Sequence, residues 1–291
     1  MRVAPLLMTA ALFFCSFVRA ETSLYEVTKN GQTIFLGGSI HVLRESDYPL
    51  PAEFEQAYKR ADILVLETDM KKASSQEFAQ QMAQVFRYSN GKNLAQDLQP
   101  KIWQELQRVC KQSQFPLEQM RGYKAMFVSL ALSVAEMQRR GYGAAQGVDA
   151  VFYQKAIADG KQTQELETSG EVLQQLTSLA DMDANRIIQG TLRDLQKMDQ
   201  MLARSVEYWR KGELQKLDQE MATDMRVETP EIYQQLLVAR NQAWLPKIES
   251  LFSSKEIELV LVGSLHLAGS EGLLEQLIAR GYQIAPYKLT K

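Results

Sequence analysis

Short apolar runs bounded by turn residues lie near both ends of the chain. Residues 23–28 and 33–38 flank Asn30 and Gly31, a dipeptide that predicts a β-hairpin because both residues accept positive φ. The continuous apolar run at residues 62–67 is typical of a strand that is buried on both faces. Further strands are predicted at residues 162–167, 257–263 and 282–287.

Helical spacing of apolar residues dominates the middle of the chain. Residues from about 74 to 146 are helical in pattern and rich in Met, and residues 122–139 are apolar over much of the helix circumference, which indicates a buried helix. The Met side chains are interpreted as core rather than as a ligand surface. Further helices are predicted from Pro51, over residues 147–160 and about 171–252, and over residues 271–280 with Ser270 as N-cap.

The order of these elements predicts an α/β fold. We expect β-α-β units at both ends of the chain to form a small, mostly parallel sheet, with a large helical insertion between them. Because no low-complexity linker interrupts the pattern, residues 21–291 are predicted to form a single domain.

The first twenty residues have the pattern of a signal peptide. Arg2 precedes an apolar stretch at residues 4–18, and small residues at Val18 and Ala20 fit a cleavage site after Ala20. An uncleaved N-terminal anchor is the alternative. No later apolar run approaches the length of a membrane span. We therefore expect a secreted or periplasmic protein without a transmembrane anchor after cleavage.

Charge and cysteine content narrow the classes of function. The formal net charge is −2, and it becomes −4 without Arg2 and Arg19, so the chain lacks the basic face of a nucleic-acid binder. The two cysteines are Cys15, in the leader, and Cys110. The mature chain therefore has no internal disulfide, and Cys110 is expected to be buried and inert.

The only two histidines occur in matching motifs. Gly38-Ser39-Ile40-His41 and Gly263-Ser264-Leu265-His266 each follow a predicted strand. Ligands bind at the carboxyl ends of parallel strands, so two such strands lying side by side would direct both imidazoles to one point. Neutral imidazole is a common ligand of Mn, Co, Zn or Fe. The alternative for either histidine alone is a hydrogen-bonded structural residue.

Acidic residues supply candidate partners for these imidazoles. Glu67 and Glu167 each end a short predicted strand, where a carboxylate can bind a metal or act as a general base. Arg240, followed by Asn241, lies in a helical stretch before the last strands, and its guanidinium could stabilise an oxyanion. The alternatives are solvated strand ends for the two acids and an exposed charge for the arginine. The interpretation for Asp149 is an acidic residue in the first turn of a helix, with no further role. Glu256 and Glu258 are expected on the surface.

A set of motifs spread over nearly the whole mature chain resembles the TraB/PrgY/GumN family, in its GumN-like branch. The motifs are at residues 36–42, 66–69, 147–149, 160–161, 165–168, 240–241, 262–267, 272–274 and 280–282. This family is similar to the Tiki proteases and, more remotely, to erythromycin-esterase and ChaN-like proteins. In those relatives paired Gly-x-x-His motifs and acidic residues form a divalent-metal hydrolase site on an α/β fold.

The resemblance implies a role for each candidate residue. His41 and His266 are implied to be metal ligands, and Glu67 to be a ligand or general base. The residues implied to support them or to act on the transition state are Glu167, Arg240 and Asn241.

The function predicted from the chain is a divalent-metal-dependent hydrolase of the cell envelope, with peptidase as the favoured activity. Its partner would be a peptide or another small extracytoplasmic substrate. The first alternative is a non-catalytic envelope protein that binds a peptide or pheromone, a metal or haem. The second is a structural role in the envelope, which the many amphipathic helical stretches permit.

Overall fold

A computed structural model describes residues 22–89 and 91–289 of the chain. The leader predicted at residues 1–20 lies outside the described residues. Within them, no helix combines the length and the apolar character needed to cross a membrane.

Six strands of the described chain form one sheet in the order β4-β3-β5-β2-β1-β6. Strands β4, β3, β5 and β2 run parallel to one another, whereas β1 is antiparallel to both β2 and β6. The mostly parallel sheet of an α/β fold is therefore confirmed. The strands are β1 (Leu24–Lys29), β2 (Gln32–Ser39), β3 (Ile63–Thr68), β4 (Gln162–Glu167), β5 (Glu258–Gly263) and β6 (Gln283–Pro286).

The predicted hairpin joins β1 to β2. Asn30 and Gly31 have φ values of 52° and 82°, and Lys29 pairs with Gln32 across the turn. Positive φ at both turn residues gives the hairpin a twist that matches that of its strands. The hairpin confirms the prediction from the Asn-Gly dipeptide.

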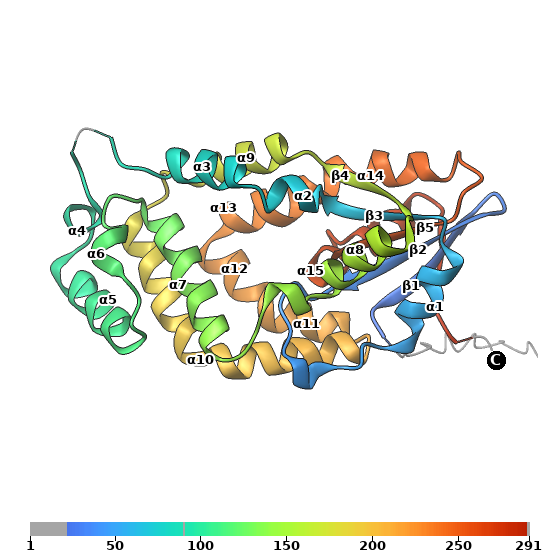
Figure 1. Ribbon diagram of the computed structural model, residues 1–291. Coiled ribbons are helices and arrows are strands. Elements are labelled where there is room, and N and C mark those ends of the chain that lie inside the picture. The colour runs from blue at the N-terminus through green and yellow to red at the C-terminus, as the bar shows by residue number, and fades with distance from the viewer. Residues whose placement is uncertain (1–21, 90, 290–291) are drawn as a thin grey trace, which may run out of the picture.

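Helices cover both faces of the sheet (Figure 1). Helices α1 (Ala52–Arg60) and α8 (Val148–Asp159), with the C-terminal end of α10 (Ala184–Arg210), pack on one face through aromatic residues that include Phe54 and Trp209. Helices α11 (Leu214–Met221), α14 (Ala239–Leu251) and α16 (Leu273–Ala279) pack on the other face with β-strand residues such as Val260 and Val262. Both faces of the central strands are thus buried, as their continuous apolar runs predict.

The helical insertion extends away from one end of the sheet (Figure 1). Its main helices are α5 (Pro100–Gln112), α7 (Ala125–Arg139) and the N-terminal part of α10, which share an apolar cluster of their own. Cys110 is buried in this cluster and free, as expected. Burial raises the pKa of its thiol to about 12, which makes it unreactive.

The prediction that the helix at residues 122–139 is buried is right for one side of the helix only. Helix α7 buries one stripe, which includes Val128 and Leu132, against α10. Leu130 and Val134 lie on the opposite side and are 42% and 47% exposed. The helix packs against its neighbours on one side only. Its apolar surface is therefore wider than the surface that it buries.

The stretch at residues 171–252 is helical as predicted and is divided into several helices. Two further expectations are corrected. The helix near residue 271 begins at Leu273 with Gly272, rather than Ser270, as its N-cap. Glu258 is buried, while Glu256 is exposed as expected. The remaining elements are η1 (Glu45–Asp47), α2 (Met70–Ala73), α3 (Gln76–Val85), α4 (Leu94–Asp97), α6 (Leu117–Met120), η2 (Ala144–Gln146), α9 (Ser169–Ser178), α12 (Thr223–Glu228), α13 (Pro230–Tyr233), the π-helix η3 (Gln234–Val238) and α15 (Ser264–Leu267).

Candidate active site

Four parallel strands end at one edge of the sheet, and each end supplies a predicted site residue. Strands β2 and β5 are neighbours, with Ser39 paired to Gly263, so the two Gly-Ser-x-His motifs leave the sheet side by side. The Ser264 hydroxyl donates to the carbonyl of Ser39 at 2.9 Å and ties the motifs together. Strands β3 and β4 bring Glu67 and Glu167 to the same edge. The carboxyl ends of these four strands therefore lie at one edge of the sheet.

His41 lies at the solvent side of this edge. Its side chain is 53% exposed, and its Nδ1 is 3.2 Å from Oδ2 of Asp149 in the first turn of α8. The Ser39 hydroxyl donates to Oδ1 of the same carboxylate at 2.8 Å. A carboxylate accepts only, so Nδ1 of His41 donates and Nε2 is left to face the interior of the site.

A close backbone contact places α8 under His41. A Cβ on Gly147 would lie 2.3 Å from the carbonyl oxygen of His41, so only glycine permits this approach. The next amide, from Val148, donates to the carbonyl of Ile40 at 3.0 Å. The helix start is thereby fixed against the first histidine motif, and Asp149 is held within reach of the ring.

His266 is buried in the short helix α15 and is 4% exposed. Its Nδ1 is 2.8 Å from Oδ1 of Asn241. The amide nitrogen of Asn241 donates to the carbonyls of His266 and Glu271, so its oxygen faces the ring and Nδ1 of His266 carries the proton. The ring of Trp244 packs against the imidazole with centroids 4.4 Å apart. Because this imidazole is neutral with its proton on Nδ1, its Nε2 carries a lone pair.

Glu67 lies between the two imidazoles. Its Oε1 is 3.7 Å from Nε2 of His41 and 3.9 Å from Nε2 of His266. The same oxygen accepts a hydrogen bond of 2.6 Å from the amide of Gly263. The structure thus brings the three residues predicted as metal ligands to one point.

Arg240 occupies the inner side of this group. Its Nη2 is 2.6 Å from Oε2 of Glu67 and 2.5 Å from Oε1 of Glu167, and its Nη1 is 3.2 Å from Nε2 of His266. The π-helix that ends at Val238 lies two residues before it, and such irregular turns are frequent at functional sites. The alternative of an exposed charge is wrong, because the side chain is only 14% exposed.

Glu167 serves Arg240 rather than the histidines. Its carboxylate accepts from Arg240, from Nε1 of Trp244 at 3.2 Å and from the Gln175 amide at 3.3 Å. It is 2% exposed, so the alternative of a solvated strand end is wrong for this residue. A buried carboxylate with three donors is a positioning group for the guanidinium.

The electrostatics differ sharply between the two histidines. Burial lowers the pKa of His266 to about 3, against the attraction of Glu67, so this imidazole is neutral. Burial also lowers the pKa of His41, but the carboxylates of Asp149 and Glu67 outweigh it and raise the pKa to about 9. For Glu67, burial raises the pKa, but the charge of Arg240, the neighbouring histidines and the hydrogen bond from the Gly263 amide together outweigh it and lower the pKa to about 2. The site therefore holds Glu67 ionised and, in the metal-free protein, favours the protonated form of His41.

The residues at this edge match a divalent metal in donor type and charge. Two imidazoles and a carboxylate form a common catalytic ligand set, and each ring has its Nδ1 held by an oxygen acceptor, as metal-bound histidines do. When His41 has released its proton, both rings are neutral, and the carboxylates of Glu67, Asp149 and Glu167 outnumber Arg240 by two charges, which a dication would balance. A Cβ on Gly263 would lie 2.9 Å from Nε2 of His41 and 3.3 Å from Oε1 of Glu67, so glycine keeps this space clear.

The same geometry also sets a condition on metal binding. Within residues 22–89 and 91–289, no three or more His, Cys, Asp or Glu side chains are gathered closely enough to form a coordination shell. Arg240 donates toward Nε2 of His266. A metal and this guanidinium would compete for the same lone pair.

Sequence reasoning missed Asp149 and Trp244 as site residues. Asp149 was given no role beyond its helix turn, although it holds His41. The signal that could have singled it out is the Gly147-Val148-Asp149 motif, since a glycine before a helix start permits close backbone approach. Trp244 gave no signal in the sequence beyond that of a core aromatic residue.

Comparisons with known proteins place the chain at the level of a family. Neither the curated proteins nor the solved structures contain a significant match to it. The model of one family, described as the TraB/PrgY/gumN family, matches residues 23–286, which is nearly the whole of the chain. The chain therefore belongs to the TraB/PrgY/gumN family.

Proposed function

We propose that this protein is a divalent-metal-dependent hydrolase of the cell envelope, with peptides as its substrates. The observation that carries the proposal is the arrangement of His41, His266 and Glu67. Both imidazoles have Nδ1 held by an acceptor and present Nε2 toward Oε1 of the same carboxylate, at 3.7 and 3.9 Å. A histidine with a purely structural role does not need to direct its Nε2 toward a carboxylate that a second histidine also faces.

His41, His266 and Glu67 are the proposed metal ligands, and Mn, Co, Zn and Fe are the candidate ions. A metal bound there would supply Lewis-acid activation of water and of a carbonyl group. The exposed side of His41 is the side from which a substrate can approach, because His266 is buried beneath Trp244.

The remaining residues have roles that follow from their contacts. Asn241 and Asp149 fix the orientation of the two rings through hydrogen bonds to Nδ1. Arg240 is held by Glu167 and places a fixed positive charge at the inner side of the site. A preorganised guanidinium can stabilise negative charge that develops on a carbonyl oxygen. Glu167 acts through Arg240 as a positioning residue.

Two sequence observations support the choice of compartment and substrate. The leader pattern at residues 1–20 favours export. Membership of the family, together with the resemblance to its GumN-like branch and to the Tiki proteases, favours peptide bonds among the bonds that such a site could hydrolyse.

The test is hydrolysis of a peptide pool by the purified protein after loading with each candidate metal, read by mass spectrometry. We expect cleavage in the wild type and a loss of at least about a hundredfold in His41→Ala and Glu67→Gln. Glu275→Gln is the control, because Glu275 is an exposed acid on α16. Equal cleavage in all four proteins, or none with any metal, would reject the proposal.

A second candidate function follows from the pairing of the buried charges with one another. Arg240 already pairs with Glu67 and Glu167 and donates toward Nε2 of His266. These buried polar groups therefore have partners within the chain. This arrangement favours a protein that binds a peptide, a metal or haem without turnover. Recovery of intact peptide from a stable complex after prolonged incubation with metal would select this candidate over the hydrolase.

A further inference from the structure

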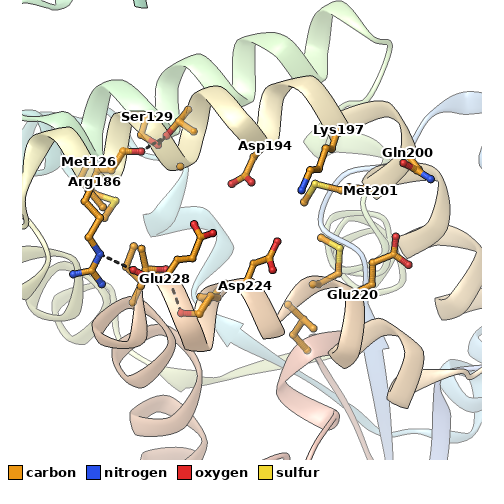
Figure 2. A pocket seen from close by; sticks show the side chains of 18 of the residues that line it. Met126, Ser129, Arg186, Asp194, Lys197, Gln200, Met201, Glu220, Asp224 and Glu228 are labelled. Carbon is orange, nitrogen blue, oxygen red and sulfur yellow. Dashed lines mark hydrogen bonds between the residues drawn. The ribbon is translucent and has the colours of Figure 1, made fainter. Parts of the chain in front are cut away.

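A cavity of about 570 Å³ lies beside the candidate active site, within the helical part of the chain. Its walls come from α7 and α10 on one side and from α11, α12 and α13 on the other. Figure 2 shows the side chains that line it. Cavities of this size hold drug-sized ligands or a few residues of a peptide.

The apolar part of the cavity lining is rich in methionine. It includes Met126 and Met201 from one wall, Met221 and Met225 from the other, and Leu265. Unbranched thioether side chains adapt to ligands of irregular shape. These side chains therefore suit the aliphatic part of a flexible side chain.

Most charges around the cavity are neutralised within the protein. Arg186 pairs with Glu231, and Arg204 pairs with Glu220. Glu228 pairs with Arg193, which stands just behind the lining residues. These three ion pairs leave no net charge.

Two carboxylates are the exception. Asp194 on α10 and Asp224 on α12 have neither an ion pair nor a hydrogen bond to any residue that the structure describes, and they point toward each other across the cavity (Figure 2). Lys197 is the one lining cation without an ion pair in the described chain. Asp194 and Asp224 are both exposed, but the partial desolvation of Asp194 raises its pKa, and the like charges of Glu228 and Asp224 add to this effect against the attraction of Arg193 and Lys197. A cation between the two walls would relieve this repulsion.

The cavity is linked to the candidate active site through two short segments. Leu265 lines the cavity and directly precedes His266 in the second histidine motif. Ile232 lines it as well, and the chain passes from there through the π-helix to Arg240. A peptide that lies in the cavity would therefore lie beside the groups proposed for catalysis.

We propose that this cavity is the specificity pocket for a basic side chain of a peptide substrate, with Asp194 and Asp224 binding the Lys or Arg head group and the methionine side chains packing on its aliphatic stem. The inference rests on the proposed hydrolase function for the identity of the peptide as substrate. The binding itself depends only on the cavity. Charge complementarity selects this occupant, because the unpaired groups leave a surplus negative charge in a cavity with an apolar, methionine-rich lining.

The test is calorimetric binding of short end-blocked peptides of alanine and leucine that carry Lys, norleucine or Glu at the central position. We expect the Lys peptide to bind about tenfold more tightly than the norleucine peptide, and the Glu peptide to bind least. Asp194→Asn and Asp224→Asn are each expected to weaken the Lys peptide about threefold, and the double variant to abolish the preference. Asp199→Asn, on the same helix but outside the cavity, is expected to bind as the wild type.

Equal affinity for the three peptides would overturn the inference, as would an unchanged preference in the folded double variant. Varying the peptide keeps the test independent of how the variants fold. Dimerisation in sedimentation that the double variant loses would assign the cavity to a second copy of the chain and would also overturn it.

The two proposals fail in different ways. Charge-selective binding without cleavage, dependent on Asp194 and Asp224, supports the pocket and rejects the hydrolase. Cleavage that is lost in His41→Ala but is indifferent to peptide charge supports the hydrolase and rejects the pocket.

Discussion

Replacing Gly263 with alanine inserts one methyl group at the centre of the candidate active site. The backbone at Gly263 has φ −52° and ψ 135°, a conformation that any L residue adopts, so the substitution adds no backbone strain. The new Cβ would lie 2.9 Å from Nε2 of His41, 3.3 Å from Oε1 of Glu67 and 3.5 Å from Cδ2 of His266. The methyl therefore acts on the proposed ligands and on little else.

The size of the effect follows from these distances. A relaxed carbon–nitrogen contact needs about 3.5 Å, so the His41 ring must move by roughly half an ångström. Ring movements of this order cost about tenfold to a hundredfold in metal affinity and in rate. The unfolding free energy should change by less than about 1 kcal/mol, because the entropic gain of Gly→Ala offsets part of the crowding.

The assay combines metal titration, peptide hydrolysis and urea unfolding of the same preparation. Gly122→Ala is the matched control, because a Cβ on Gly122 would meet no atom within 4 Å. A folded Gly263→Ala protein with wild-type metal affinity and rate would refute the assignment of the reaction centre to this space. Global unfolding of the variant would show instead that the glycine serves packing.

Three further predictions concern the ring of His41, the ring of His266 and the fold. In metal-free protein His41 binds its proton more tightly when folded, with a pKa of about 9 against 6.5, so its contribution to the unfolding free energy is present below about pH 6.5 and is lost as the pH rises through about 9. This slope should be absent from urea unfolding of His41→Gln. Asn241→Ala removes the acceptor at Nδ1 of His266 and should weaken metal binding about tenfold to a hundredfold in equilibrium titrations. Trp209→Phe removes a buried hydrogen bond of 2.6 Å to the carbonyl of Gly38 and should lower the unfolding free energy by about 1–2 kcal/mol in urea.

Each of these predictions has a control or a contrary outcome. Identical pH slopes for wild type and His41→Gln would show that His41 gains no proton affinity on folding. Asn241→Asp keeps an oxygen acceptor, so it should retain more metal affinity than Asn241→Ala, and equal losses would contradict the proposed orientation role. Trp103→Phe, at a partly buried position of α5, is the control for Trp209→Phe. Equal losses of unfolding free energy in the two variants would contradict the importance of the hydrogen bond from Trp209 to the carbonyl of Gly38.

The strands and their ends were predictable because local pattern determines them. The continuous apolar run at residues 62–67 indicates β3 directly, and the Gly-Ser-x-His repeat marks the ends of β2 and β5. The placement of β5 between β3 and β2 is different, because it depends on pairing between segments about 200 residues apart. No local pattern states that order, although the matching motifs suggested that both histidines would meet if β2 and β5 lay side by side.

The supporting residues of the site were less accessible to sequence reasoning. Asp149 contacts His41 across 108 residues of chain, and only the packing of α8 under the ring creates that contact. Glu167 was expected near the imidazoles but pairs with Arg240. The reason is that β4 is an outermost strand of the sheet, separated from β5 and β2 by β3. The sequence predicts that the carboxyl ends of these strands lie on the same side of the sheet. It does not predict which side chains at these ends come into contact.

The most direct test of the central claim is the divalent metal content of the protein purified from Glu21 onward. It would be measured in the wild type, His41→Ala and His266→Ala, with folding of each checked by circular dichroism. The account predicts one Mn, Co, Zn or Fe ion per chain in the wild type after reconstitution and its loss in both folded variants. A wild type that binds no metal, or variants that retain it, would contradict a single site built from the two Gly-x-x-His motifs.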